Sequence, residues 1–444
     1  MEQHSGASER EWSESGRRRF LRAAGIGAVG LAGGAWSELR AQGAASMSDG
    51  PPRSGPLPPP IIFPKIQADT ETEETKAPSA FAPDERVGFA VVGLGRLALQ
   101  QILPAMHESK RCKVTALVTG DAAKGARVAA QYGVDPKKVY SYADFDRIRD
   151  DTAVDVVYVV LPNSMHEEYV TRAAKAGKHV LTEKPMATSV AEAERMVAAC
   201  RAANRLLMVA YRIQYEPHHR LVRQMMRDGK LGAVKLIEMA NDQAQGGDLN
   251  QWRLKRAMSG GGSLPDVGIY CFNTARFLTG EEPIEITATQ YTTPNDPRFR
   301  EVEETVAWTM RFPSGVLASC TTSYGTHSAK RYRVCGAEAW AEMDPAFPYK
   351  GLRLSISRKS GLAEGAEGKE QLSLGEKNQF ALEMDHMADC VTNGKRPFTP
   401  GEEGVQDHVV QAAIYEAART GRAVKLAPAA RRDATRGPEP EPQS

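Results

Sequence analysis

Residues 88–98 read G-F-A-V-V-G-L-G-R-L-A, and this stretch decides the fold. The apolar run 88–92 has the length of a buried strand, and a helical pattern follows the glycines. Gly93 permits a tight turn, Gly95 lets the backbone approach a pyrophosphate, and the small Ala98 allows helix and strand to pack closely. In this strand–turn–helix context, the G-x-G-x-x-A spacing predicts a dinucleotide-binding loop.

The same alternation of strand and helix continues to residue 210, with further strands expected at 114–118, 154–161, 179–182 and 206–210. It predicts βαβ units, and the continuous apolar runs predict a parallel sheet covered on both faces. Beyond residue 211, strands follow one another with few helices. We therefore expect an α/β fold: a Rossmann dinucleotide-binding domain at 85–210 and an α+β domain at 211–426 with a large, mostly antiparallel open sheet.

The open sheet also bears on assembly. A sheet face of that size usually needs a partner, so we expect a homo-oligomer, a dimer or a tetramer.

The residues before the first domain have the pattern of an export signal. The run R-R-R-F-L at residues 17–21 matches the twin-arginine pattern, and the weakly apolar run 23–35 after it is too short to span a bilayer. Residues 1–43 are therefore predicted to be a twin-arginine signal peptide that sends the folded protein to the periplasm. Residues 44–84 are rich in proline, and either an extended arm or a disordered linker is expected there. The polar tail 427–444 is expected to be disordered.

Composition excludes several classes of function. The chain has 444 residues, 41% hydrophobic and 25% charged, with a net charge of +2, which favours neither nucleic acid nor a membrane surface as a partner. Its six cysteines are scattered, without a CxxC pair or a Cys/His cluster. Neither a disulfide scaffold nor a metal site is therefore expected.

The end of the second strand bears on the choice of nucleotide. Thr119 stands at the strand tip with Lys124 one helical turn later, a combination that suits the 2′-phosphate of NADP. The alternative makes Asp121 the ligand of a ribose diol and the cofactor NAD, although Asp121 also fits a helix N-cap. The local chemistry favours NADP.

Two later motifs could carry the chemistry. Lys184, in the sequence Glu183-Lys184-Pro185, follows a strand and could bind a substrate oxygen or lower the pKa of a neighbouring tyrosine. Its alternative is an exposed loop lysine. Asp266 and Tyr270 are four residues apart and would share one helix face, presenting a carboxylate and a phenol together. Their alternatives are a helix cap and a core aromatic residue.

Longer stretches around these motifs resemble the Gfo/Idh/MocA oxidoreductase family, and within it the periplasmic glucose–fructose oxidoreductases. The resemblance covers nearly everything after residue 86 and rests on residues 91–95, 161–164, 183–189, 260–263, 266–270, 280–284 and 400–404. It implies a tightly held NADP and ping-pong hydride transfer between sugars, with glucose oxidised to gluconolactone and fructose reduced to sorbitol. It also implies that the arm wraps a neighbouring subunit and covers its adenine.

The resemblance further implies roles for individual residues. Lys184 and Tyr270 would form the catalytic pair, and Asp266 would orient the sugar hydroxyls. Contacts with the cofactor would come from Gly93, Leu94, Gly95, Arg96, Thr119, Lys124, Leu161, Asn163, His166, Glu183, Lys184, Arg212, Trp252, Arg253 and Tyr349.

Two segments, 239–251 and 324–330, depart from the pattern of that subgroup and leave the identity of the sugars open. Two other functions also stay open. One is an NAD(P)-dependent aldose or polyol dehydrogenase that releases its cofactor, and the other is a non-catalytic sugar- or nucleotide-binding protein.

Overall fold

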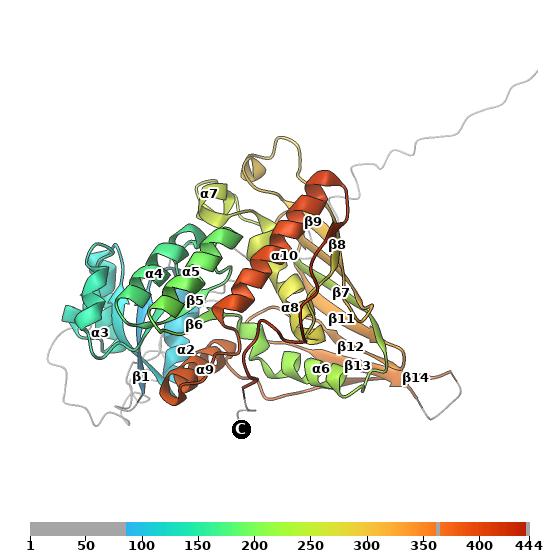
Figure 1. Ribbon diagram of the computed structural model, residues 1–444, viewed down its shortest axis with the longest axis horizontal. Coiled ribbons are helices and arrows are strands. Elements are labelled where there is room, and N and C mark those ends of the chain that lie inside the picture. The colour runs from blue at the N-terminus through green and yellow to red at the C-terminus, as the bar shows by residue number, and fades with distance from the viewer. Residues whose placement is uncertain (1–85, 361–364, 441–444) are drawn as a thin grey trace, which may run out of the picture. The chain divides into compact units, whose positions relative to one another are not determined.

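The structure is a computed structural model that describes residues 86–360 and 365–440, which build two sheets and their helices (Figure 1). The predicted signal peptide, 1–43, and the proline-rich segment, 44–84, lie outside the described residues. Within the two described ranges, no helix combines the length and the apolar character needed to cross a lipid bilayer.

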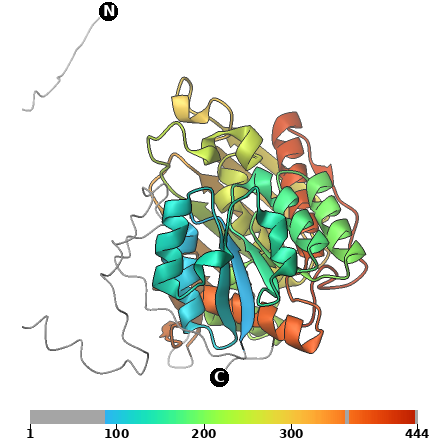
Figure 2. The ribbon, with the colours of Figure 1, turned by 90° about the vertical axis from the view of Figure 1, so that its left-hand side faces the viewer.

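The first sheet has six parallel strands in the order β3-β2-β1-β4-β5-β6. The strands are β1 (Val87–Val92), β2 (Cys112–Val118), β3 (Val139–Tyr140), β4 (Val156–Val159), β5 (His179–Glu183) and β6 (Leu207–Ala210). Figure 2 shows helices on both sides of this sheet, which is why its strands are apolar on both faces. These helices include α2 (Leu103–Glu108), α3 (Ala122–Tyr132), α4 (His166–Lys175) and α5 (Val190–Ala202). The strand order reverses between β1 and β4, the place where open α/β sheets bind ligands.

The second sheet has nine strands in the order β14-β13-β12-β11-β7-β10-β9-β8-β15. Every neighbouring pair is antiparallel except β7 and β10. The strands are β7 (Val234–Asp242), β8 (Glu285–Tyr291), β9 (Thr305–Arg311), β10 (Leu317–Ser323), β11 (Ala329–Gly336), β12 (Ala339–Met343), β13 (Leu354–Lys359), β14 (Glu367–Leu372) and β15 (Val424–Lys425). The fold class predicted from the sequence is confirmed.

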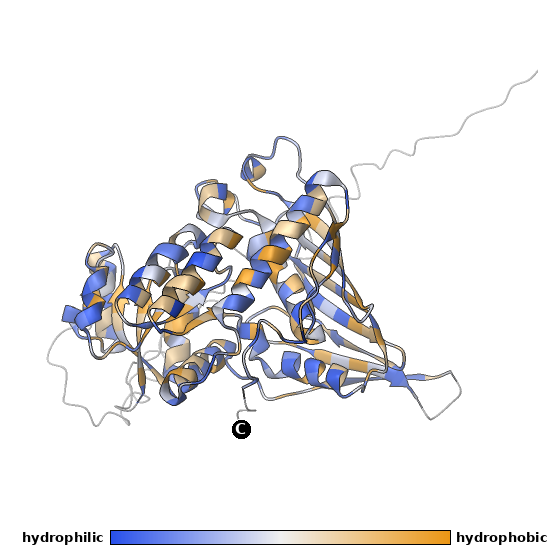
Figure 3. Ribbon diagram, in the orientation of Figure 1, coloured by the Kyte–Doolittle hydropathy of each residue, from blue (hydrophilic) through white to orange (hydrophobic). Residues whose placement is uncertain are grey.

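One face of this second sheet is covered by helices. In β9, Val306, Trp308 and Met310 are buried while the residues between them are partly exposed, the alternation of a sheet with one dry face. The ring of Trp308 packs edge-on against Phe272 at 6.4 Å between centroids. Figure 3 shows this mixture of apolar and polar residues along the strands. The covering helices are α6 (Pro217–Arg227), α8 (Ile269–Thr279) and α10 (Gly401–Thr420).

Two helices of the second half of the chain return to the first sheet. Helix α10 packs against α5, and α9 (Gln379–Asn393) packs against α2 and β2. The side chain of His408 in α10 accepts a hydrogen bond from the backbone N–H of Ala187 at 3.0 Å. The two sheets are thereby joined by helices as well as by the chain connection.

Strand β14 was not predicted. Its sequence, E-G-K-E-Q-L, offers no alternating apolar face, and its residues are exposed or nearly so. It is the edge strand of the sheet and pairs only with β13, so no packing requirement marks it in the sequence.

The C-terminal tail differs from the predicted disorder over residues 427–440. The backbone N–H of Asp433 donates to the carbonyl of Gly280, and that of Gly437 donates to Phe398. The guanidinium of Arg436 is buried against Glu403, with Nη2 at 2.5 Å from Oε1. Burial alone would raise the pKa of Glu403, but Arg276 and Arg436 outweigh it and lower that pKa to about 2. A polar tail is ordered here because its charges meet buried partners.

Candidate active site

A cavity of about 510 Å³ opens where β1, β4 and β5 end and faces the second sheet. It is lined by all but one of the residues predicted from the sequence to bind cofactor or act in catalysis. These are Gly93, Leu94, Gly95, Arg96, Thr119, Lys124, Leu161, Asn163, Glu183, Lys184, Arg212, Trp252, Arg253, Asp266, Tyr270 and Tyr349.

The glycine loop at one end of the cavity fits a dinucleotide. Gly93 has φ +96°, and a Cβ there would lie 2.3 Å from the carbonyl oxygen of Val160, so no other residue suits the turn. At Gly95, by contrast, a Cβ would meet nothing within 4 Å. The absence of a side chain at Gly95 thus keeps the cavity open beside the backbone, where a pyrophosphate can approach.

The residues expected to select the nucleotide lie beside this loop. Thr119 follows β2, and its hydroxyl accepts a hydrogen bond from the N–H of Asp121 at 3.2 Å. Asp121 is the N-cap of α3, where Oδ1 accepts from Lys124 N–H at 2.9 Å. The ammonium of Lys124 donates to the carbonyl of Leu94 at 3.4 Å and lies at the cavity. Asp121 therefore caps α3 through Oδ1 and also lines the cavity, and the cation of Lys124 lines it together with Thr119.

His166 is the exception among the predicted residues, because it lies behind the cavity wall. Its ring is fully buried and contacts the carbonyls of Leu161, Pro185 and Met186 at 2.8, 3.1 and 3.2 Å. Burial lowers the pKa of His166. His166 thus joins the Leu161 loop to the Lys184 loop and is not among the residues that line the cavity, and its direct contact with the cofactor stays a prediction. A histidine near a strand end does not reveal from sequence which way its ring points.

The other end of the cavity gathers charged side chains. Lys184 Nζ donates to the backbone carbonyl of Asp266 at 2.7 Å and lies 3.8 Å from its Oδ1. Asp266 Oδ2 is 3.2 Å from Arg253 Nε and accepts from the phenol of Tyr324 at 2.7 Å. Burial alone would raise the pKa of Asp266, but Arg253, Lys184 and Tyr324 outweigh it and hold the pKa below its usual value. Asp266 is therefore a carboxylate whose Oδ1 is the less occupied oxygen.

Tyr270 lies between two cations. Arg212 Nη2 donates to its phenol oxygen at 3.1 Å, and Lys184 Nζ is 4.6 Å from the centre of its ring. The guanidinium of Arg212 is itself held by the side chain of Gln379 at 2.5 Å and by the carbonyl of Phe347 at 2.6 Å. The donor that faces the phenol is thus fixed in place, and the phenol hydrogen is not used in that contact.

Asp266 and Tyr270 do not share a regular helix face. Residues Leu264–Gly268 form a wide helical turn that holds Asp266, and Tyr270 is the second residue of α8. Such turns occur often at functional sites because they displace one side chain relative to an ideal helix. Both side chains still reach the cavity, so the predicted pairing is present with a different local geometry.

Two further residues that line the cavity were not predicted from the sequence. Gln243 directly follows β7, is 1% exposed, and has no hydrogen-bond partner for Oε1 or Nε2 among the described residues. Two features of the sequence could have marked Gln243 as a cavity residue. It directly follows a strand, and it lies in the segment 239–251 that departs from the subgroup pattern. Phe380, at the start of α9, packs edge-on against Tyr349 at 5.1 Å. No local signal marks Phe380, since it comes to the cavity from a distant helix.

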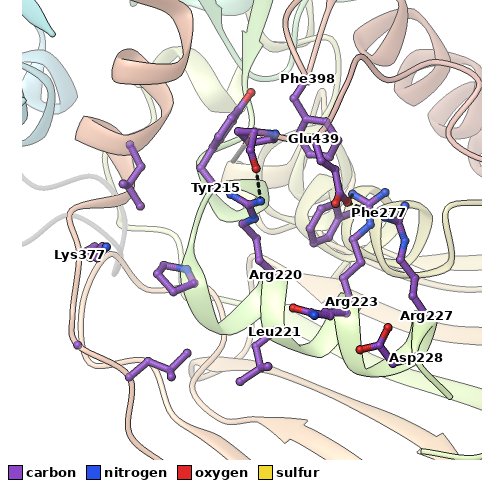
Figure 4. Close-up of a pocket in the computed structure, with 16 residues that line it drawn as sticks. Tyr215, Arg220, Leu221, Arg223, Arg227, Asp228, Phe277, Lys377, Phe398 and Glu439 are labelled. Carbon is purple, nitrogen blue, oxygen red and sulfur yellow. Dashed lines mark hydrogen bonds and ion pairs between the residues drawn. The ribbon is translucent and has the colours of Figure 1, made fainter. Parts of the chain in front are cut away.

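A second cavity, of about 780 Å³, lies along α6 and shares no lining residue with the first (Figure 4). Arg220, Arg223 and Arg227 line it in a row on one helix face. Arg223 donates to Asp433 at 2.7 Å, Arg227 to Glu439 at 2.8 Å, and Arg220 to the carbonyl of Pro440. The C-terminal segment therefore already binds these cations, and the cavity along α6 adds nothing to the candidate active site.

Known families and proteins resemble the chain over both domains. Residues 87–211 match the oxidoreductase family described as GFO_IDH_MocA, with an NAD-binding Rossmann fold. Residues 219–342 match the GFO/IDH/MocA C-terminal domain.

Individual relatives extend this likeness. A D-xylose 1-dehydrogenase [NADP(+)] of Haloarcula marismortui is 32% identical over 356 residues, covering 78% of this chain and 94% of the relative. A 1,5-anhydro-D-fructose reductase of Ensifer adhaerens is 27% identical, covering 76% and 98%. Among solved structures, an aldose-aldose oxidoreductase from Caulobacter crescentus complexed with glycerol is 43% identical, with a TM-score of 0.73, covering 77% and 100%.

Proposed function

Because the chain belongs to the Gfo/Idh/MocA oxidoreductase family, whose NAD(P)-dependent sugar oxidoreductases it resembles, we propose that it transfers hydride between two sugars through one NADP. In this proposal an aldose is oxidised to its lactone, and a second sugar reoxidises the cofactor before it leaves. Glucose and fructose are the expected pair, giving gluconolactone and sorbitol. The name of the Caulobacter relative also supports a second aldose as the acceptor.

A single observation carries the proposal: one cavity joins the nucleotide loop to a phenol, a carboxylate and a lysine. Gly93 and Gly95 lie at one end, and Lys184, Asp266 and Tyr270 at the other. A purely binding protein needs the loop and polar side chains for a sugar. It does not need a phenol held between two cations, and that arrangement favours an enzyme.

Tyr270 is the proposed proton donor and acceptor. A bound nicotinamide supplies the hydride acceptor for one sugar and the hydride donor for the other. The phenol hydrogen of Tyr270 can point at a substrate oxygen because Arg212 already occupies a lone pair of the phenol oxygen. When the phenol has given up its proton, the Arg212 hydrogen bond and the Lys184 charge stabilise the phenolate.

Asp266 and Lys184 are the proposed sugar-orienting groups. Asp266 Oδ2 already accepts from Tyr324 and pairs with Arg253, so Oδ1 remains to accept a sugar hydroxyl. Lys184 lies 3.8 Å from that oxygen and can donate to the sugar oxygen that changes its bonding. The amide of Gln243, which has no partner among the described residues, offers its NH₂ group as donor and its oxygen as acceptor to further hydroxyls.

The nucleotide is NADP in this proposal. Thr119 and Lys124 line the cavity beside the glycine loop and supply a hydroxyl and a cation suited to a 2′-phosphate, while Asp121 Oδ1 is engaged as a helix cap. The Haloarcula relative is named for NADP(+) as well.

The test of the proposed function is a spectrum of the purified, exhaustively dialysed protein before and after addition of glucose and then fructose. A nicotinamide signal that stays with the protein, becomes reduced with glucose and disappears with fructose supports the two-sugar cycle. If the retained nucleotide responds to neither sugar, other aldoses should be tried in pairs. Should no pair of sugars produce the cycle, the proposal is wrong.

A dehydrogenase that releases its cofactor is the second candidate, supported by the name of the Haloarcula relative. It predicts that the dialysed protein carries no nucleotide and reduces added NADP in proportion to the aldose supplied.

The proposal places the enzyme in the periplasm, exported by the twin-arginine machinery as a folded protein with NADP inside. It is proposed to act as a homo-oligomer in which residues 44–84 of one subunit cover the adenine of another. Deleting residues 44–84 should then raise the NADP dissociation rate, and the signal segment fused to a reporter should require the twin-arginine translocase.

A further inference from the structure

Three buried oxygen-bearing side chains form a cluster that begins in the cavity wall and extends behind it. Tyr158 of β4 and Glu183 of β5 lie on the same face of the first sheet, because Tyr158 pairs with Leu181 and residues two apart point the same way. Glu383 approaches this face from α9. The phenol oxygen of Tyr158 is 2.8 Å from Glu183 Oε1 and 3.2 Å from Glu383 Oε1.

The hydrogen atoms of this cluster can be counted. A phenol has one hydrogen and can donate to one carboxylate only. If both carboxyl groups were ionised, the phenol could donate to one of them only. The other carboxylate would then face a lone pair of the phenol oxygen, with no hydrogen atom between the two oxygens. One carboxyl group must therefore carry a proton and donate to the phenol oxygen.

The surroundings decide which carboxyl group holds that proton. Burial raises the pKa of Glu183 above its usual value, but the charges of Lys184 and Arg212 act against burial. Its Oε2 also accepts from the backbone N–H of Lys184 at 3.3 Å, which favours the ionised form. Glu383 is fully buried, and its Oε2 has no hydrogen-bond partner among the described residues. Burial and then the charge of Glu183 raise the pKa of Glu383 well above its usual value of 4.5, against a smaller effect of Arg212. The proton belongs on Glu383.

We infer that Glu383 is a neutral carboxylic acid that donates to Tyr158, which donates to Glu183, and that this relay positions the Glu183 carboxylate in the cavity wall. Glu183 borders Lys184, so its position fixes the loop from which the lysine reaches Asp266. Glu383 is a positioning residue, since it acts through Tyr158 and does not line the cavity. The catalytic consequence rests on the proposed function, whereas the protonation does not.

The protonation is tested by infrared difference spectroscopy of the NADP-bound enzyme at neutral pH. Glu383→Gln should remove one carbonyl-stretch band of a buried, protonated carboxylic acid. Glu216→Gln is the matched control, because Glu216 is also buried but its hydrogen-bond donors, His218 and the His219 N–H, outweigh burial and lower its pKa. If the carbonyl-stretch band is present in both variants, or absent from both, the inference is overturned.

The pH dependence of stability gives a second readout. A carboxyl group whose pKa is raised by folding stabilises the protein fully below pH 4.5, and this contribution is lost as the pH rises through the folded-state pKa. Glutamine cannot ionise, so the melting temperature of Glu383→Gln should rise relative to wild type as pH increases from about 5 to about 9. Parallel curves for the two proteins would contradict the assignment.

The positioning role is tested by sugar turnover. Glu383→Leu removes the donor and should lower kcat/KM about tenfold, the effect of one lost hydrogen bond to a charged relay. Glu383→Gln retains an N–H donor toward Tyr158 and should restore most of the rate. Tyr158→Phe breaks the relay from the other side and serves if Glu383→Leu does not fold. Full activity of Tyr158→Phe would show that the relay does not position Glu183, whether or not the infrared band is found.

Discussion

The two ends of the cavity are built in different ways. The nucleotide end consists of Gly93, Gly95, Thr119 and Lys124, all within one stretch of about thirty residues and acting largely through backbone and one cation. At the chemical end, side chains from the end of β5, the turn after β6, the turn at Trp252–Leu254 and the start of α8 converge around Asp266 and Tyr270.

This difference has physical consequences. Backbone groups of a tight loop are placed by the loop itself, so the nucleotide end needs little support from elsewhere. The charges at the chemical end are partly buried, so each is more stable with a partner, and Asp266 pairs with Lys184 and Arg253 and accepts from Tyr324. A substitution at the chemical end should therefore disturb the reaction most, and one at the nucleotide end should mainly change the choice of coenzyme.

The largest effect is expected for Tyr270→Phe. Loss of the proton-transferring phenol should lower kcat by roughly 10²–10⁴-fold, while NADP stays bound. Steady-state rates with the sugar pair and the nucleotide content of the dialysed variant check this. Tyr332→Phe is the control, because the Tyr332 phenol lies near His219 and Tyr332 does not line the cavity. Near-normal turnover of Tyr270→Phe would refute its role.

A smaller loss is expected for Asp266→Asn. Without its charge, Arg253 and Lys184 lose their shared partner, and kcat/KM for the sugar should fall by about 10- to 100-fold. Affinity for NADP, measured by fluorescence titration, should change much less than the sugar KM. Asp248→Asn, at an exposed loop position outside the cavity, should leave both unchanged. Equal losses for nucleotide and sugar would mean that the two ends are not separable.

Lys124→Ala should affect only the nucleotide end. Removal of the cation should raise the Kd for NADP by about tenfold and leave the Kd for NAD nearly unchanged, because only NADP carries the 2′-phosphate. Calorimetric titration of each coenzyme measures the ratio. Lys137→Ala, an exposed lysine that does not line the cavity, is the control. An equal rise in the Kd for NADP and for NAD would show that Lys124 does not bind the 2′-phosphate.

The smallest effect is expected for Gln243→Leu. One or two lost hydrogen bonds to sugar hydroxyls should raise the sugar KM by about three- to tenfold. Deoxy sugars identify the hydroxyl: the analogue that lacks it should bind the wild type and Gln243→Leu equally well. If each deoxy analogue binds more weakly than the parent sugar by the same factor in both proteins, Gln243 does not contact the sugar.

The fold and the nucleotide end could be predicted from the sequence because their signals are local. The spacing of Gly93, Gly95 and Ala98, the apolar runs of β1 to β6 and the cap at Asp121 each lie within a few residues of what they specify. The edge strand β14 and the tail at Asp433–Arg436 could not be predicted, since their order depends on distant partners such as β13 and Glu403.

At the chemical end the sequence determined which residue types are present. The resemblance to the family indicated which of these residues lie together in one site. Only the tertiary structure decided that His166 turns behind the wall, that Arg212 donates to Tyr270, and that Gln243 finds no hydrogen-bond partner in the part of the chain that the structure describes. Only the tertiary structure also brings Glu383 to Tyr158 across 225 residues of chain. The reason is physical: a side chain's direction and the charge it carries depend on packing and burial by remote segments, which no local pattern records.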